Sequence, residues 1–186
     1  MFNDARSKKL IITAHCLLNQ NSISDGTADL PSQFVEIIHL LMAYQVGIIQ
    51  LPCPEFSCLG LARGDEAGAN RELLLENTRI RTLLEAEENR ALLRMKAREL
   101  AGNLVEYQKY GFQILGVLGI NRSSSCGIET TTREGRESQG QGVFMKILAE
   151  ELARQELPLK MVGIKTSRKE DSLENVRKLL AMQECG

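Results

Sequence analysis

The sequence lacks the features of several large classes of protein. No segment approaches the ~20 consecutive apolar residues of a membrane-spanning helix, and residues 1–9 are charged instead of forming the apolar run of a signal peptide. The 23 basic and 24 acidic residues give a net charge of −1, without a basic stripe that would bind a nucleic-acid backbone. We therefore expect a cytoplasmic protein with neither a membrane nor a nucleic acid as its partner.

Five cysteines are present, but they match no familiar pairing. The count is odd, the chain is large enough to bury a core and no export signal precedes it, so a disulfide scaffold is not expected. No CxxC pair occurs either, which excludes zinc-ribbon and ferredoxin motifs. Three interpretations remain open for the cysteines: buried core thiols, a metal or cluster site, or a catalytic nucleophile.

Short apolar runs alternate along the chain with segments of helical periodicity. Each run has the length and apolar content of a buried strand. Such alternation predicts a Rossmann-like three-layer α/β sandwich with a mostly parallel four-stranded sheet, formed by residues 1–186 as a single domain. The predicted strands are 10–14, 46–51, 112–120 and 159–164, and the predicted helices include 34–42, 142–154 and a last helix capped by Ser172.

Residues 70–110 form the longest helical segment and contain no proline. About forty residues exceed the usual length of a helix, so we expect two helices or a break near 87–89. The sequence leaves open whether this segment forms a lid over a site or a subunit contact in a homodimer.

Three of the five cysteines follow three consecutive predicted strands. Cys16 follows the first strand, Cys53 the second and Cys126 the third. Open α/β sheets bind ligands beyond the carboxyl ends of their strands, and neighbouring strands lie about 4.8 Å apart. We therefore expect the three thiols to face one small inorganic centre. Three thiolates leave one iron of an iron–sulfur cluster open, which makes that cluster a Lewis acid.

Three motifs around these cysteines resemble the 2-thiouracil desulfurase family. The first motif is Cys16 with the Asp-Gly pair at 25–26, the second is Pro-Cys-Pro-Glu at 52–55, and the third is Ser-Ser-Ser-Cys-Gly at 123–127. A glycine-rich helix start at 140–143 is also similar. Together, these ordered motifs are more specific than any one of them alone.

Some positions depart from the family pattern. Asn19 replaces a glycine, residues 23–24 replace an Arg-Tyr pair, and Ser124 replaces a proline. These positions surround the expected pocket, whereas all three cysteines are present. The sequence therefore resembles a divergent, related member of the family, and it leaves open whether the substrate is thiouracil or a different thiolated compound.

The resemblance implies a [4Fe-4S] cluster held by Cys16, Cys53 and Cys126. It also implies a desulfidase whose substrate is a thiolated pyrimidine base or nucleotide. Water would replace sulfur at the carbon atom with no net redox change. Soft thione sulfur is a ligand that suits iron.

Two side chains are candidates for the proton transfers of such a reaction. Glu55 lies two residues after a cysteine ligand and is the candidate acid or base; the alternative is a loop carboxylate paired with Arg63. Ser123 matches a serine of the family motif and is the candidate that orients the substrate or relays a proton. The alternative is a turn whose hydroxyls cap backbone groups. Backbone N–H groups of this turn are also candidates for binding an anion such as a nucleotide phosphate.

The other cysteines and the histidines have weaker roles. Cys58 is either a fourth ligand or a buried thiol that packs as a small hydrophobe, and Cys185 is expected to be inert. His15 is expected to point away from its neighbour on a strand and to have a structural or supporting role, and His39 is expected in the core.

Other functions remain as alternatives to a desulfidase. A non-enzymatic iron–sulfur or sulfide-carrier protein would hold the same cluster without turnover. A cysteine hydrolase with His15 as its base is less favoured, because adjacent residues of a strand face opposite sides. A structural zinc site is a fourth, weaker alternative.

Overall fold

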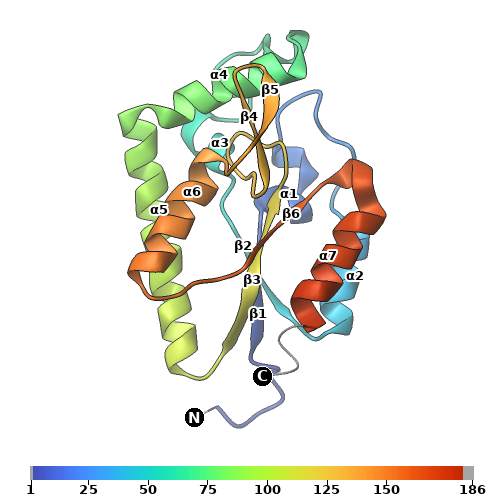
Figure 1. Cartoon of the computed structure of the whole chain (residues 1–186), viewed down its shortest axis with the longest axis vertical. Helices are drawn as coiled ribbons and strands as arrows, with labels where there is room; N and C mark the ends of the chain where they lie inside the picture. Colours follow the sequence, from blue (N-terminus) through green and yellow to red (C-terminus); the bar gives the residue numbers. More distant parts are fainter. Residues whose placement is uncertain (1, 182–186) are drawn as a thin grey trace.

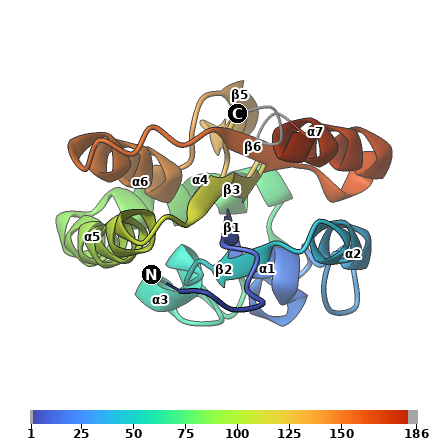
Figure 2. The same ribbon diagram turned by 90° about the horizontal axis from the view of Figure 1, so that it is seen from below.

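The computed structural model describes residues 2–181 (Figure 1). Four strands form one all-parallel sheet in the order β2-β1-β3-β6, and helices cover both of its faces (Figure 2). The predicted Rossmann-like three-layer α/β fold is therefore confirmed. The strands are β1 (Lys9–Thr13), β2 (Gly47–Gln50), β3 (Gln113–Ile120), β4 (Thr130–Arg133), β5 (Arg136–Gln139) and β6 (Met161–Ile164). The α-helices are α1 (His15–Leu18), α2 (Val35–Ala43), α3 (Pro54–Leu59), α4 (Leu73–Glu85), α5 (Glu87–Lys109), α6 (Val143–Arg154) and α7 (Lys169–Ala181).

Two apolar clusters, one on each face of the sheet, hold the layers together. Consecutive residues of a strand point to opposite faces, so Ile11 and Ile12 enter different clusters, as do Val117 and Leu118. Helices α5 and α6 cover one face, and α2 and α7 cover the other (Figure 2). Because both faces are buried, the strands have continuous apolar sequences.

The order of the strands creates a switch point between β1 and β3. The chain passes from β1 to β2 at one edge, then returns beyond β1 to β3 and continues to β6. This reversal places α2 on one face and α5 and α6 on the other, as crossovers of a single hand require. Ligands of such sheets bind outside the carboxyl ends of the strands at the switch point. Helices α1, α3 and α4 and the β4–β5 hairpin gather at this end of the sheet (Figure 1).

The long helical segment forms two helices, as predicted. The break falls at Ala86, one residue before the expected 87–89, where the backbone is extended with ψ 142°. Helix α4 then lies across the hairpin: Thr78 Oγ1 accepts from Gly135 N at 2.9 Å, and Arg81 Nη1 donates to Thr131 Oγ1 at 3.1 Å. Helix α4 therefore covers part of the carboxyl end of the sheet within this chain.

Local structure differs from the prediction in several places. Helix α7 begins at Lys169, so Ser172 lies inside the helix and does not cap it; its hydroxyl instead binds the backbone N–H and C=O of Lys165. His15 belongs to helix α1 rather than to a strand, and His39 is exposed on α2 instead of buried in the core. The β4–β5 hairpin was not predicted, because its largely polar residues show no apolar alternation.

Cys185 lies outside the described residues. Among residues 2–181, no helix combines the length and the apolar character that crossing a membrane requires.

Candidate functional site

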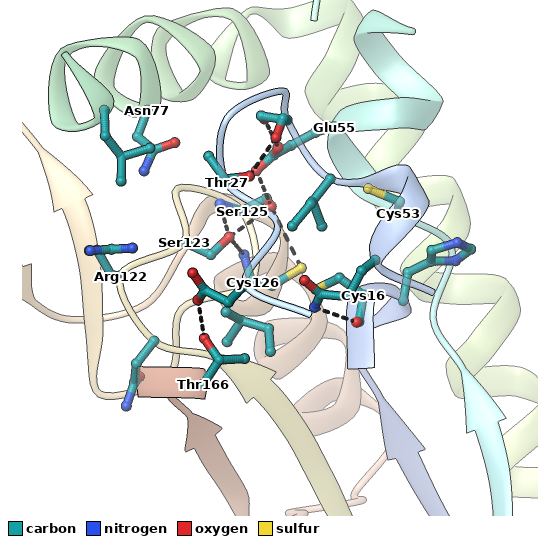
Figure 3. A pocket seen from close by; sticks show the side chains of 18 of the residues that line it. Cys16, Thr27, Cys53, Glu55, Asn77, Arg122, Ser123, Ser125, Cys126 and Thr166 are labelled. Atoms are coloured by element: carbon teal, nitrogen blue, oxygen red, sulfur yellow. Dashed lines mark hydrogen bonds between the residues drawn. The ribbon is translucent and has the colours of Figure 1, made fainter. Parts of the chain in front are cut away.

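A pocket of about 270 Å³ lies at the switch point, and Cys16, Cys53 and Cys126 all line it (Figure 3). Cys16 is the second residue of α1, Cys53 directly precedes α3, and Cys126 lies in the turn after β3. The fold therefore brings together three side chains that are far apart in the sequence. It does so as expected for residues that follow the carboxyl ends of neighbouring parallel strands.

The three thiols are close enough to influence one another electrostatically. Burial raises the pKa of Cys16 to about 12, and Cys53 and Glu55 add to the increase. Burial also raises the pKa of Cys126 well above its usual value, with further contributions from Cys16 and Cys53. For Cys53, burial and then the Glu55 carboxylate raise the pKa. Burial thus disfavours thiolates here, so none of these three thiols has the lowered pKa of an activated nucleophile.

The donor set suits an iron–sulfur cluster. Within residues 2–181, no three His, Cys, Asp or Glu side chains surround the position of a single metal ion. In a cluster, each cysteine binds a different iron atom, so the sulfur atoms lie further apart than the ligands of one ion. Three soft thiols that line one pocket have the chemistry that iron favours, whereas a hard cation would need oxygen ligands.

Glu55 occupies the centre of a hydrogen-bond network beside the thiols. Its Oε1 accepts from Ser125 Oγ at 2.7 Å and from Ser124 Oγ at 3.1 Å. Its Oε2 accepts from Arg63 Nε at 3.1 Å and from Ser24 Oγ at 3.4 Å. The ion pair with Arg63 confirms the alternative given for this residue. It leaves Glu55 in the pocket, however, with its carboxylate oriented by four donors from three loops.

The buried side chain of Arg63 holds this network in place. Its side chain is 2% exposed, and it also donates to the backbone carbonyl oxygens of Gly60, Leu61 and Ser22. A weaker contact of 3.9 Å joins its Nη2 to Cys53 Sγ. Arg63 therefore connects the second cysteine loop to the loop that follows Cys16.

The Ser123 hydroxyl caps backbone N–H groups of its own turn, as the alternative interpretation of the serine run proposed. Its Oγ accepts from the backbone N–H groups of Ser125 at 3.3 Å and Cys126 at 3.0 Å. These N–H groups are therefore used within their own turn and do not form an anion cradle. The N–H groups of Val143 and Phe144, at the start of α6, donate to the carbonyl oxygens of Ser124 and Ser125, which fixes the turn beside the pocket.

A hydroxyl chain nevertheless links Ser123 to Glu55. Ser123 Oγ and Ser125 Oγ are 3.2 Å apart, and the single proton of Ser125 is donated to Glu55 at 2.7 Å. Ser123 must then be the donor in the first of these bonds. Ser123 and Ser125 both line the pocket (Figure 3), so a continuous path for a proton runs from the pocket to the carboxylate.

Of the two remaining candidate residues, His15 lies at the pocket and Cys58 lies outside it. His15 lines the pocket, but its Nδ1 is 3.2 Å from the Leu51 carbonyl oxygen, which agrees with a structural role. Cys58 does not line the pocket. Its Sγ contacts Asn89 O at 4.0 Å and packs against the core cluster, so this thiol is not placed as a fourth ligand.

Several polar residues that line the pocket were not among the residues predicted from the sequence. They come from the segment after α1, from α4 and from the loops after β3 and β6: Gln20, Thr27, Asn77, Arg122, Lys165 and Thr166. None of them carried a local signal: even Gln20, four residues after Cys16, does not share a helical turn with it, because the backbone of Asn19 between them is extended (φ −153°, ψ 95°). These residues reach the pocket through tertiary packing.

Fold and pocket together define an α/β protein of Rossmann-like architecture with a three-thiol pocket at its switch point. The chain is 31% identical over 123 residues to MJ0003, an uncharacterized protein of Methanocaldococcus jannaschii; the match covers 66% of this chain and 70% of the archaeal protein. The chain belongs to the same family as that protein. No family model and no solved structure matches the chain.

Proposed function

We propose that this protein is a [4Fe-4S]-cluster-dependent desulfidase that removes sulfur from a thiolated small molecule of the thiopyrimidine base or nucleotide class. The observation that carries the proposal is the meeting of Cys16, Cys53 and Cys126 in one pocket beside Glu55. Three soft donors suit a cluster with one open iron. The resemblance of the cysteine motifs to the 2-thiouracil desulfurase family supports the same reaction.

In this reaction one water is consumed, its oxygen replaces the sulfur on carbon, and sulfide leaves without any net transfer of electrons. When bound, the cluster supplies a Lewis-acidic iron that takes the charge of the departing sulfur. Glu55 takes the proton of the attacking water, since its carboxylate is held by fixed donors beside the thiols. Ser125 and Ser123 carry a proton between Glu55 and the substrate along their hydrogen-bonded hydroxyls.

A cysteine hydrolase fits the site less well. Its nucleophile would need a lowered pKa, whereas burial raises the pKa of Cys16, Cys53 and Cys126. A non-enzymatic carrier of iron–sulfur or sulfide remains the main alternative, because it would use the same three cysteines.

Anaerobic purification tests the cluster. The wild-type protein should be brown, with about four irons and four sulfides per chain. Serine substitutions at Cys16, Cys53 or Cys126 should each remove most of the iron. Cys58→Ser is the matched control, because Cys58 lies outside the pocket, and it should keep the wild-type content. A colourless, iron-free wild-type protein would overturn the proposal.

Turnover separates the enzyme from the carrier. Loaded protein is incubated with a panel of thiopyrimidines and thionucleotides, and sulfide release is measured. Glu55→Gln should lower the rate about a hundredfold or more while the iron content stays unchanged, since it removes the carboxylate that takes up the proton but leaves all three cysteines in place. A full cluster with no sulfide released from any of the panel would support the carrier instead.

A further inference from the structure

Gln20 lines the pocket and carries a buried acceptor atom without a partner in the described part of the chain. Its residue is 5% exposed and lines the pocket. The side-chain Nε2 donates to the Cys16 carbonyl oxygen at 2.9 Å, whereas Oε1 has no hydrogen-bond partner within residues 2–181. Because the Cys16 carbonyl can only accept, the nitrogen must face it. The orientation of the amide is therefore determined by chemistry, and the oxygen is the unpaired atom.

The backbone holds Gln20 firmly in this position. Gln20 begins a short 3-10 helix, η1 (Gln20–Ser22), and its N–H donates to Ser32 O at 2.5 Å. Buried side-chain acceptors without a partner are rare and ask for an explanation. Among residues 2–181 the other such atom is Thr13 Oγ1, which belongs to β1 and does not line the pocket. Gln20 thus combines an unpaired buried acceptor with a position in the lining of the pocket.

We propose that Gln20 Oε1 accepts a hydrogen bond from an N–H group of the substrate, and that Gln20 thereby selects heterocycles of the thioamide type. This inference rests on the proposed function for the identity of the sulfur compound. In a thioamide-type ring, the N–H is bonded to the carbon atom that carries the sulfur. Gln20 is itself hydrogen-bonded to the backbone of Cys16, one of the three pocket cysteines. The N–H and the sulfur of such a ring are adjacent, so the N–H would meet Gln20 while the sulfur lies beside the cysteines.

The same argument predicts which sulfur compounds are rejected. Thioethers, thioesters and fully N-alkylated thiones have no N–H beside the sulfur-bearing carbon. Binding one of them would leave the buried Gln20 oxygen without the donor that a thioamide N–H supplies. A site with an unpaired buried polar group discriminates strongly against such analogues.

Equilibrium binding of two probes tests the inference. The probes are 2-thiouracil and 1,3-dimethyl-2-thiouracil, titrated into anaerobically purified wild-type protein and into Gln20→Met, which has a similar volume but no acceptor. The dimethyl compound should bind the wild type about tenfold or more weakly. In Gln20→Met the two compounds should bind within about twofold of each other. A penalty that persists unchanged in Gln20→Met would show that the added methyl groups act by their bulk, and would overturn the inference.

A second variant covers the loss of the bond to Cys16. Gln20→Glu keeps an acceptor oxygen but loses the donor, so it should retain discrimination against the methylated probe. If Gln20→Met fails to fold, as thermal unfolding would show, the wild-type and Gln20→Glu titrations still decide. Equal binding of the two probes to the wild type and to Gln20→Glu would overturn the inference.

The same comparison with uracil and 1,3-dimethyluracil separates the inference from the proposed function. These probes carry no sulfur and require no turnover. If the protein holds no cluster and releases no sulfide, but still prefers uracil about tenfold or more, then the proposed function fails and the role of Gln20 stands. If sulfide is released while methylated and unmethylated probes bind equally, the role of Gln20 fails alone.

Discussion

Replacing Glu55 by glutamine removes the charge that neutralises Arg63 while the shape of the side chain is kept. The pair is buried: the Arg63 side chain is 2% exposed and the Glu55 side chain 12% exposed, with Nε and Oε2 3.1 Å apart. Removing one partner of a buried ion pair typically costs about 3–5 kcal/mol, because the other charge stays buried and unpaired.

The expected loss is smaller than that range for two structural reasons. Arg63 keeps its hydrogen bonds to the carbonyl oxygens of Gly60, Leu61 and Ser22. In addition, the glutamine oxygen can still accept from Arg63 while its NH₂ group faces hydroxyls that are able to rotate and accept. We therefore expect Glu55→Gln to lower the free energy of unfolding by about 2 kcal/mol, and Glu55→Ala by about 4 kcal/mol.

Urea denaturation of the metal-free protein measures this loss. With a slope of about 2 kcal/mol per molar urea, the midpoint of Glu55→Gln should fall by about 1 M. The matched control is Glu134→Gln, since Glu134 pairs with Arg136 on the surface, where both side chains are more than 70% exposed; its midpoint should not move measurably. A midpoint for Glu55→Gln equal to that of the control would refute the view that a buried ion pair organises the site.

Three further predictions concern acid stability and the backbone. The Arg79 guanidinium lowers the pKa of Glu76, so their pair stabilises the fold above the unfolded-state pKa of about 4.3 and this stabilisation is lost as the pH falls through the folded-state pKa. Glu76→Gln should therefore cost about 1 kcal/mol at pH 7 and less at pH 3 in urea titrations. Arg122 has a φ of 71°, so Arg122→Gly should be about 1 kcal/mol more stable than Arg122→Ala by thermal unfolding. Gly142→Ala should cost about 2–3 kcal/mol, because its Cβ would lie 2.5 Å from Ser125 O.

Each of these predictions has a specific contrary result. A Glu76→Gln penalty that is the same at pH 3 and pH 7 would assign its cause to packing instead of charge. Arg122→Ala as stable as Arg122→Gly would mean that the left-handed backbone carries no strain. The control for Gly142→Ala is Gly102→Ala on α5, where an added Cβ meets nothing within 4 Å; it should stabilise the helix by about 0.5–1 kcal/mol. Equal losses at Gly142 and Gly102 would contradict the steric argument.

Much of the fold could be predicted because burial leaves a local pattern in the sequence. The run that became β3 is apolar on both faces, so its position and type were readable without any neighbour. The β4–β5 hairpin shows the opposite case, because residues such as Thr131 and Thr132 are buried polar groups that only their partners satisfy. A polar run of this kind is indistinguishable from a loop until its contacts exist.

The sequence by itself determined an α/β protein with parallel strands and a cysteine shortly after each of the first three. That information is local, since the periodicity of apolar residues records which faces are buried. Only the tertiary structure decided that these cysteines share one pocket, because the position of β1 between β2 and β3 brings their loops together. It alone also joined Glu55 to Ser125, seventy residues away, and left the Gln20 oxygen buried without a partner. Hydrogen bonds between distant segments follow from how whole elements pack, and no short stretch of sequence records that packing.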